Sequence, residues 1–153
     1  MPVSTVGVIA RMAIAALAAS FIAVAAAAAA DVPGIMAQWG MLGTWASSCT
    51  APASRDNPYY SWVRRGADAS LDRDYGDAKD SNRVLGASVL PDGSLELRVE
   101  FKAFSQTRLN VYTKGNDGRI RMMTNQDVRG GYSVKDGKLV ANGAATPWDT
   151  RCR

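Results

Sequence analysis

The chain has 153 residues, a formal net charge of +4, two cysteines and no histidine. The small charge does not require a polyanionic partner. Without histidine, a Ser–His or Cys–His nucleophile is excluded, and the usual Zn²⁺ sites have no ligand set. No Gly-x-Ser-x-Gly motif and no phosphate-binding glycine loop occurs either. We therefore expect a protein that is not an enzyme and that carries no metal and no cofactor.

Residues 1–30 are typical of a secretory signal peptide. Arg11 precedes an apolar run from Met12 to Val24, and an alanine tract follows it up to residue 30. The alternative is a membrane anchor, for which this segment is barely long enough. We predict a helical signal peptide over 1–30, cleaved before the next residue, and one β-barrel domain over 31–153 in the periplasm or outside the cell.

The start of the predicted domain combines a short apolar segment with a loop. Residues 31–41 contain Pro33 and Gly34 ahead of apolar side chains, which fits either one or two helical turns or an irregular lead-in. Residues 44–46 predict the beginning of a strand. Serine, proline, asparagine and arginine are frequent in residues 47–58, which predicts a surface loop.

Aromatic and β-branched residues predict the next strands. Residues 59–65 form one strand, and residues 70–75 form its partner across a short turn. We expect a polar loop at 76–82, because this segment is rich in aspartate, asparagine and serine. A further strand is predicted at 83–90.

Four aspartates lie in and before this predicted loop. They are Asp72, Asp74, Asp77 and Asp80. Their spacing around Gly76 leaves a Ca²⁺ loop open as an alternative. However, Arg73 and Lys79 interrupt the acidic residues, and no glutamate closes the loop as a bidentate ligand would. We expect a polar loop without a metal.

The clearest strand follows the turn at Pro91–Gly93. The odd-numbered residues from Leu95 to Phe101 are apolar, and the even-numbered residues from Glu96 to Lys102 are charged. This alternation predicts a strand with one buried face and one solvated face. Two carboxylates on the solvated face, Glu96 and Glu100, suggest an acid–base pair, but a solvated face with Arg98 between them favours a charged stripe.

The second half of the domain continues as hairpins. In the predicted strand at 107–114 we assign Leu109 and Val111 to the buried face and Asn110 and Tyr112 to the outer face. The remaining predicted strands are 119–124, 127–134 and 138–142, separated by glycine-containing turns. In the second of them we expect a bulge or bend at Gly130–Gly131.

The predicted fold is all-β, an antiparallel up-and-down meander of about seven to nine strands closed into a small barrel. Closure removes exposed strand edges. In an oxidising compartment Cys49 and Cys152 form one disulfide, which holds the first and last segments side by side. A barrel places its first and last strands together, so the bridge fits this fold.

Gly43, Thr44 and Trp45 on the first strand, together with Arg151 beside the last cysteine, resemble the lipocalin/avidin (calycin) group. The resemblance implies that Trp45 plugs one end of the barrel and that Arg151 packs across its ring, a cation–π contact. Small bacterial periplasmic inhibitors of metalloproteases are similar in outline.

Two functions are compatible with such a barrel. The first is a binding protein that holds a small apolar ligand. The residues expected to line its site are Trp62, Leu97, Val99, Phe101 and Met122. Met122 and Met123 are adjacent, so they face opposite sides of a strand. The second is an inhibitor or interaction protein that acts on another exported protein. We expect no nucleic acid partner and no stable membrane span after signal cleavage.

Overall fold

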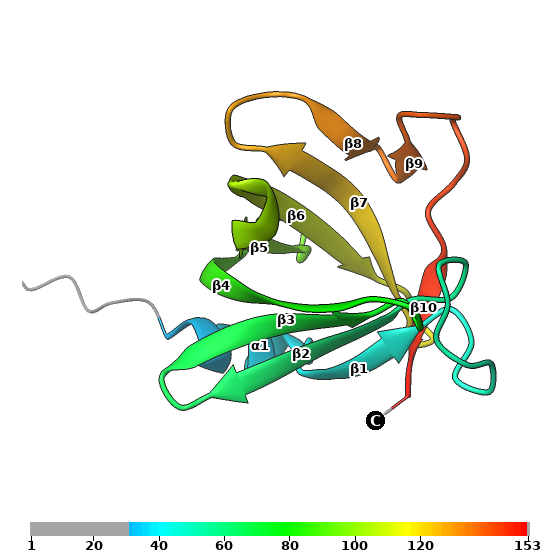
Figure 1. The fold of residues 1–153 in the computed structure, drawn as a ribbon. Coiled ribbons are helices and arrows are strands. Elements are labelled where there is room, and N and C mark those ends of the chain that lie inside the picture. The colour runs from blue at the N-terminus through cyan, green and yellow to red at the C-terminus, as the bar shows by residue number, and fades with distance from the viewer. Residues whose placement is uncertain (1–30, 153) are drawn as a thin grey trace, which may run out of the picture.

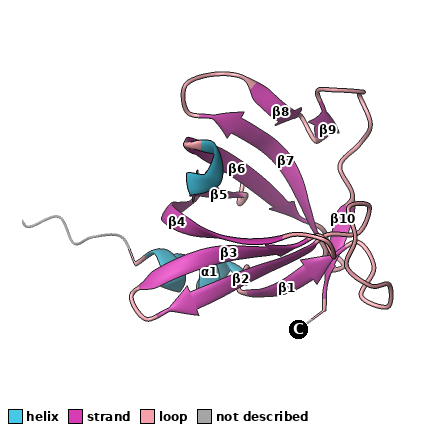
Figure 2. Cartoon of the chain, in the orientation of Figure 1, coloured by secondary structure: helices cyan, strands magenta, loops and turns pink. Residues whose placement is uncertain are grey.

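The computed structural model describes residues 31–152, so the predicted signal peptide lies outside the described residues. In this part of the chain, strands dominate and α1 is followed by ten of them (Figures 1 and 2). The elements are, in chain order, α1 (Val32–Trp39), β1 (Gly43–Ala46), β2 (Tyr59–Arg65), β3 (Asp68–Asp74), β4 (Lys79–Val89), β5 (Leu95–Phe101), the 3₁₀ turn η1 (Lys102–Phe104), β6 (Gln106–Lys114), β7 (Ile120–Asp127), β8 (Tyr132–Lys135), β9 (Lys138–Leu139) and β10 (Trp148–Arg151).

Eight of the strands close into an antiparallel barrel, which confirms the predicted all-β fold. From β1 to β7 each strand pairs with the next one in sequence. β10 then lies between β1 and β7 and pairs with both. The hairpin of β8 and β9 extends from the far part of β7 and stands apart from the ring in Figure 1.

The ends of the domain are joined as predicted. Cys49 and Cys152 form a disulfide whose Cα atoms lie 5.3 Å apart, across a sequence separation of 103. Beside it, the register places Trp45 opposite Arg151, and the Cys152 N–H donates to the carbonyl of Thr44 at 2.7 Å. Covalent and hydrogen-bonded links therefore close the barrel at the same seam.

The lead-in segment is helical, which settles one of the open alternatives. The Asp31 carboxylate caps α1 by accepting a hydrogen bond from the Gly34 N–H at 3.0 Å. The helix ends at Gly40, whose φ of 86° lies in the left-handed region that favours glycine. Met36 and Met41 are fully buried in the barrel core.

The alternation in β5 is confirmed, but the predicted faces of β6 are wrong. Asn110 is only 1% exposed and Tyr112 only 4% exposed, whereas Leu109 and Val111 are half-buried. The register gives the reason: Asn110 lies opposite Leu97 of β5, and directly opposed residues share a face of the sheet. Polar side chains of β6 therefore point into the barrel.

Residues 79–82, predicted as part of a loop, belong to β4. Lys79 lies opposite Asp74 of β3, and Asp80 lies opposite Arg73. The opposite charges stabilise the pairing of the two strands. The polar composition that suggested a loop thus reflects cross-strand ion pairs.

The bend expected at Gly130–Gly131 in the predicted strand 127–134 is a full turn, so this segment does not form a single strand. β7 continues to Asp127, and β8 begins at Tyr132. Between them Gly130 and Gly131 both have positive φ, with values of 110° and 85°. Glycine adopts this conformation without steric cost, so the chain reverses here.

Replacing both cysteines tests the closing bridge. The Cys49→Ser/Cys152→Ser variant should lose about 3 to 5 kcal/mol of unfolding free energy, because the disulfide limits the entropy of a long loop in the unfolded chain. Urea denaturation of the oxidised wild type and the variant measures the difference. The reduced wild type is the control and should match the variant. A loss below about 1 kcal/mol would contradict the importance of the bridge.

Candidate functional site

The α1 side of the barrel interior is packed with apolar side chains. The Trp39 indole N–H donates to the Gly93 carbonyl in the β4–β5 turn at 2.9 Å. The Lys114 ammonium at the end of β6 donates to the Trp39 carbonyl and lies 4.3 Å from the centre of its ring. These contacts fasten α1 to two turns of the barrel, with Met36 directed into the core.

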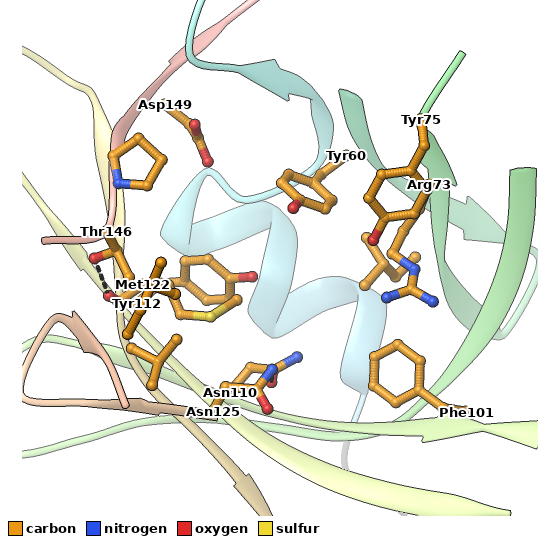
Figure 3. Close-up of a pocket in the computed structure, with 14 residues that line it drawn as sticks. Tyr60, Arg73, Tyr75, Phe101, Asn110, Tyr112, Met122, Asn125, Thr146 and Asp149 are labelled. Carbon is orange, nitrogen blue, oxygen red and sulfur yellow. Dashed lines mark hydrogen bonds between the residues drawn. The ribbon is translucent and has the colours of Figure 1, made fainter. Parts of the chain in front are cut away.

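A cavity of about 210 Å³ occupies another part of the interior (Figure 3). β7 pairs with β10 at Ile120 and Arg121 but with β8 at Asn125 and Gln126, so the barrel wall parts along β7. The β8–β9 hairpin and the segment before β10 complete the cavity wall. The lining residues are Tyr60, Leu71, Arg73, Tyr75, Phe101, Asn110, Tyr112, Met122, Asn125, Val134, Leu139, Thr146, Pro147 and Asp149.

The structure brings two of the five predicted lining residues to this cavity, Phe101 and Met122. The other three, Trp62, Leu97 and Val99, do not line it. They are buried in the apolar core that α1 joins through Met36 and Met41. They face inward as expected, but neighbouring side chains fill the space beside them.

One wall of the cavity carries a network of polar side chains. The Asn125 side-chain amide donates to the Asn110 Oδ1 at 2.9 Å, and the Asn125 Oδ1 accepts hydrogen bonds from Ser133 and Arg108. Asn110 and Asn125 lie opposite each other on β6 and β7. The cross-strand register therefore places two amides side by side inside the barrel.

Arg73 supplies a cation to the cavity wall, and Asp80 balances its charge. The guanidinium donates to both carboxylate oxygens of Asp80, with the Nε contact at 2.8 Å. Its central carbon lies 4.7 Å from the ring centre of Phe101 and 5.4 Å from that of Tyr75. The hydrogen bond from Arg73 lowers the pKa of Asp80, so this pair is ionised at neutral pH.

Asp149 places a carboxylate in the cavity wall, and it is only 8% exposed. The Ser47 hydroxyl donates to its Oδ1 at 3.0 Å. Burial raises the pKa of Asp149 to about 6, and the hydrogen bond from Ser47 offsets part of this effect. No ion pair formed within residues 31–152 includes Asp149.

Tyrosines lie between these two charged regions. In Figure 3, Asp149 and Arg73 are on opposite sides of the cavity, and Tyr60 and Tyr112 project between them. Burial raises the pKa of both phenols, and proximity to Asp149 raises it further. Both hydroxyls are therefore protonated at neutral pH and are available as hydrogen-bond donors or acceptors.

Trp45 and Arg151, the pair named from the family resemblance, lie next to each other outside the cavity. The Arg151 guanidinium carbon is 5.7 Å from the centre of the Trp45 ring. The Trp45 indole N–H donates to the Met41 carbonyl at 2.8 Å, and Arg151 donates to the carbonyl of Leu42. The pair thus ties the closing strands to the end of α1.

The four aspartates considered as a cation loop are each paired with a basic residue. The pairs are Asp72 with Arg65, Asp74 with Lys79, Asp77 with Arg55 and Asp80 with Arg73. Within the described range the structure holds no group of three or more potential metal-ligating side chains. Likewise, no helix between residues 31 and 152 is long and apolar enough to span a membrane.

Comparison of the chain with protein-family models, with curated proteins and with solved structures finds no match. The closed eight-stranded antiparallel barrel is consistent with a calycin-like architecture.

Sequence reasoning missed most of the polar cavity residues. Tyr60 and Arg73 were expected only as strand residues, and Asp149 only as part of the terminal segment. The inward position of Asn110 follows from its pairing with Leu97 of β5. The alternation of residue types within β6 does not show by itself which face of that strand is buried. The sequence feature that could have indicated these site residues is the combination of aromatic and polar side chains in residues 59–75.

Replacing Asp149 with asparagine tests the burial of its charge. Because folding raises its pKa to about 6, the folded chain holds this proton at a pH where the unfolded chain has lost it. This group therefore lowers stability as the pH rises from about 4 to about 6, and the cost persists at higher pH. Asp149→Asn should raise the unfolding free energy at pH 7 by about 1 to 3 kcal/mol.

Urea denaturation at pH 5 and pH 7 measures this effect. The gain in stability of Asp149→Asn should be larger at pH 7 than at pH 5. Asp56→Asn, on an exposed loop residue, is the control and should change stability by less than about 0.5 kcal/mol. Equal destabilisation of the Asp149 variant at both pH values would contradict a buried, unpaired carboxylate.

Proposed function

We propose that this protein is a non-catalytic binding protein that holds a small molecule in the cavity beside the β8–β9 hairpin. We also propose that the protein is exported to the periplasm or the cell exterior and that, like a lipocalin, it holds its ligand inside the barrel. A volume of about 210 Å³ is suited to a molecule of roughly one substituted ring, since a cavity of about 150 Å³ accepts benzene.

The polar interior is the observation that carries the proposal. Asn110 is 1% exposed and lies at the cavity wall, between Leu97 on one neighbouring strand and Asn125 on the other. Burying polar groups is costly unless they are hydrogen-bonded, and a core of packed apolar side chains avoids this cost. Ligand sites combine apolar walls with a few placed polar groups, and this cavity has that composition.

The chemistry of the lining refines the ligand that the sequence suggested. A purely apolar ligand was expected from an interior of tryptophan, leucine and valine. The cavity instead presents aromatic faces from Tyr75 and Phe101 together with the amides of Asn110 and Asn125. The proposed ligand therefore has an apolar ring and polar substituents.

A binding role suits these residues better than catalysis. Among the described residues that line the cavity, none is a serine, a cysteine or a lysine. The one threonine, Thr146, donates its hydroxyl hydrogen to the Met122 carbonyl at 2.7 Å. Catalysis by a serine, cysteine, threonine or lysine nucleophile needs a free hydroxyl, thiol or amine beside a base, and the described lining offers no such group.

A second candidate is an interaction protein that acts on another exported protein. Large apolar side chains are exposed on and beside the β8–β9 hairpin. These residues are Val128, Tyr132, Leu139 and Val140, of which Val140 is 58% exposed. Exposed apolar side chains on and beside one hairpin suit a protein partner.

Purifying the protein from its native source and identifying any bound small molecule or protein by mass spectrometry distinguishes the two candidates. We expect wild type to release a small molecule. Met122→Trp should release none, because the larger side chain occupies the cavity, whereas Met123→Trp should retain it, because Met123 does not line the cavity. An empty wild-type cavity would contradict the proposal. A retained protein, lost on Tyr132→Ser/Val140→Ser substitution, would favour the second candidate.

A further inference from the structure

We infer that the ligand of this cavity is a cation, an aromatic or alicyclic amine whose ammonium group pairs with Asp149. This inference rests on the proposed binding function and adds the charge of the ligand.

The Asp149 carboxylate is more than nine-tenths buried and has unused acceptor capacity. An ionised carboxylate offers about four acceptor positions. Ser47 fills one of them, and the described residues supply no other side-chain hydrogen bond to this group. Figure 3 shows the carboxylate directed into the cavity, toward the side on which Tyr60 lies. An ammonium group with three donors would satisfy the remaining positions.

No positively charged side chain among the described residues neutralises the negative charge of Asp149. From β2 and β6 it faces Tyr60 and Tyr112, which are neutral at physiological pH. From β1 and the loop after it the near group is the Ser47 hydroxyl, and from β7 the residue opposite is Ile120. The cavity wall therefore keeps a negative charge at this end.

The nearby arginines are already engaged. Arg73 lies across the cavity in a two-hydrogen-bond pair with Asp80. Arg121 of β7 donates to Thr146 and to the carbonyl of Gly137, and Arg151 of β10 donates to the carbonyl of Leu42. A cationic ligand would neutralise the wall, whereas an anionic ligand would add a second negative charge beside Asp149.

Aromatic side chains in the lining also favour a cation. Tyr60 and Tyr112 project into the cavity between Asp149 and Arg73, whereas the rings of Tyr75 and Phe101 already face the Arg73 guanidinium. Ring faces attract cations, and the attraction strengthens when the cation is shielded from water. The same groups would enclose the apolar part of the ligand.

Three small probes that share one ring separate the effect of charge from that of shape. Benzylamine is a cation at pH 7.5, benzyl alcohol is neutral and benzoate is an anion. Isothermal titration of wild type should show benzylamine binding at least about tenfold more tightly than benzyl alcohol, and benzoate more weakly than either.

Variants assign the preference to Asp149. Asp149→Asn should weaken benzylamine binding at least about tenfold and change benzyl alcohol binding by less than about twofold. Asp56→Asn is the matched control and should change neither. In wild type, benzylamine affinity should fall by up to about tenfold per pH unit below the pKa of about 6 of Asp149, and this dependence should be absent in Asp149→Asn.

The outcomes separate this inference from the proposed function. If benzyl alcohol or benzoate binds as tightly as benzylamine and Met122→Trp abolishes that binding, the inference is overturned and the binding function stands. If benzylamine binding is unaffected in Asp149→Asn, the inference is overturned as well. If none of the three probes binds and wild type from its native source is empty, both fail.

Discussion

The insertion of β10 between β1 and β7 is the constraint on which the rest of the structure depends. Four residues form this strand, and the Cys49–Cys152 disulfide holds its end against β1. The same strand carries Arg151, which lies over Trp45, and Asp149, which points into the barrel. Closing the barrel therefore also positions the carboxylate. The disulfide and the pairing of β10 with β1 and β7 therefore close the barrel and also place the negative charge of Asp149 in the cavity wall.

The barrel interior has two parts because different elements fill it. α1 supplies Met36 to an apolar core that includes Trp62 and Leu97. Beyond this core, β7 leaves β10 and pairs with β8, and the cavity lies along this divergence. Here the inward side chains are amides, phenols and charged groups. A carboxylate kept charged and buried at neutral pH lowers stability, which is the expected trade-off at a binding site.

Local patterns in the sequence predicted most of the architecture but not β10. No strand was expected after the predicted strand at 138–142, of which only the two residues of β9 form a strand. Strict alternation predicted β5, glycine-containing turns predicted the hairpins, and the two cysteines predicted the closing bridge. The faces of β6 could not be predicted in this way, because Leu109 and Val111 are as compatible with burial as Tyr112 is. Pairing with β5 decides between them. The cavity depends on such long-range registers, so Asn110 and Asp149 were not recognised as site residues from the sequence.

The central claim is that Asp149 is a buried, unpaired carboxylate facing a cavity. The most direct measurement is the titration of its carboxyl carbon by NMR, in wild-type protein labelled with ¹³C and assigned by comparison with Asp149→Asn. The account predicts a midpoint near pH 6 in the ligand-free protein. A midpoint near pH 4, the usual range of a solvated aspartate, would show that the carboxylate is open to water and would contradict the account.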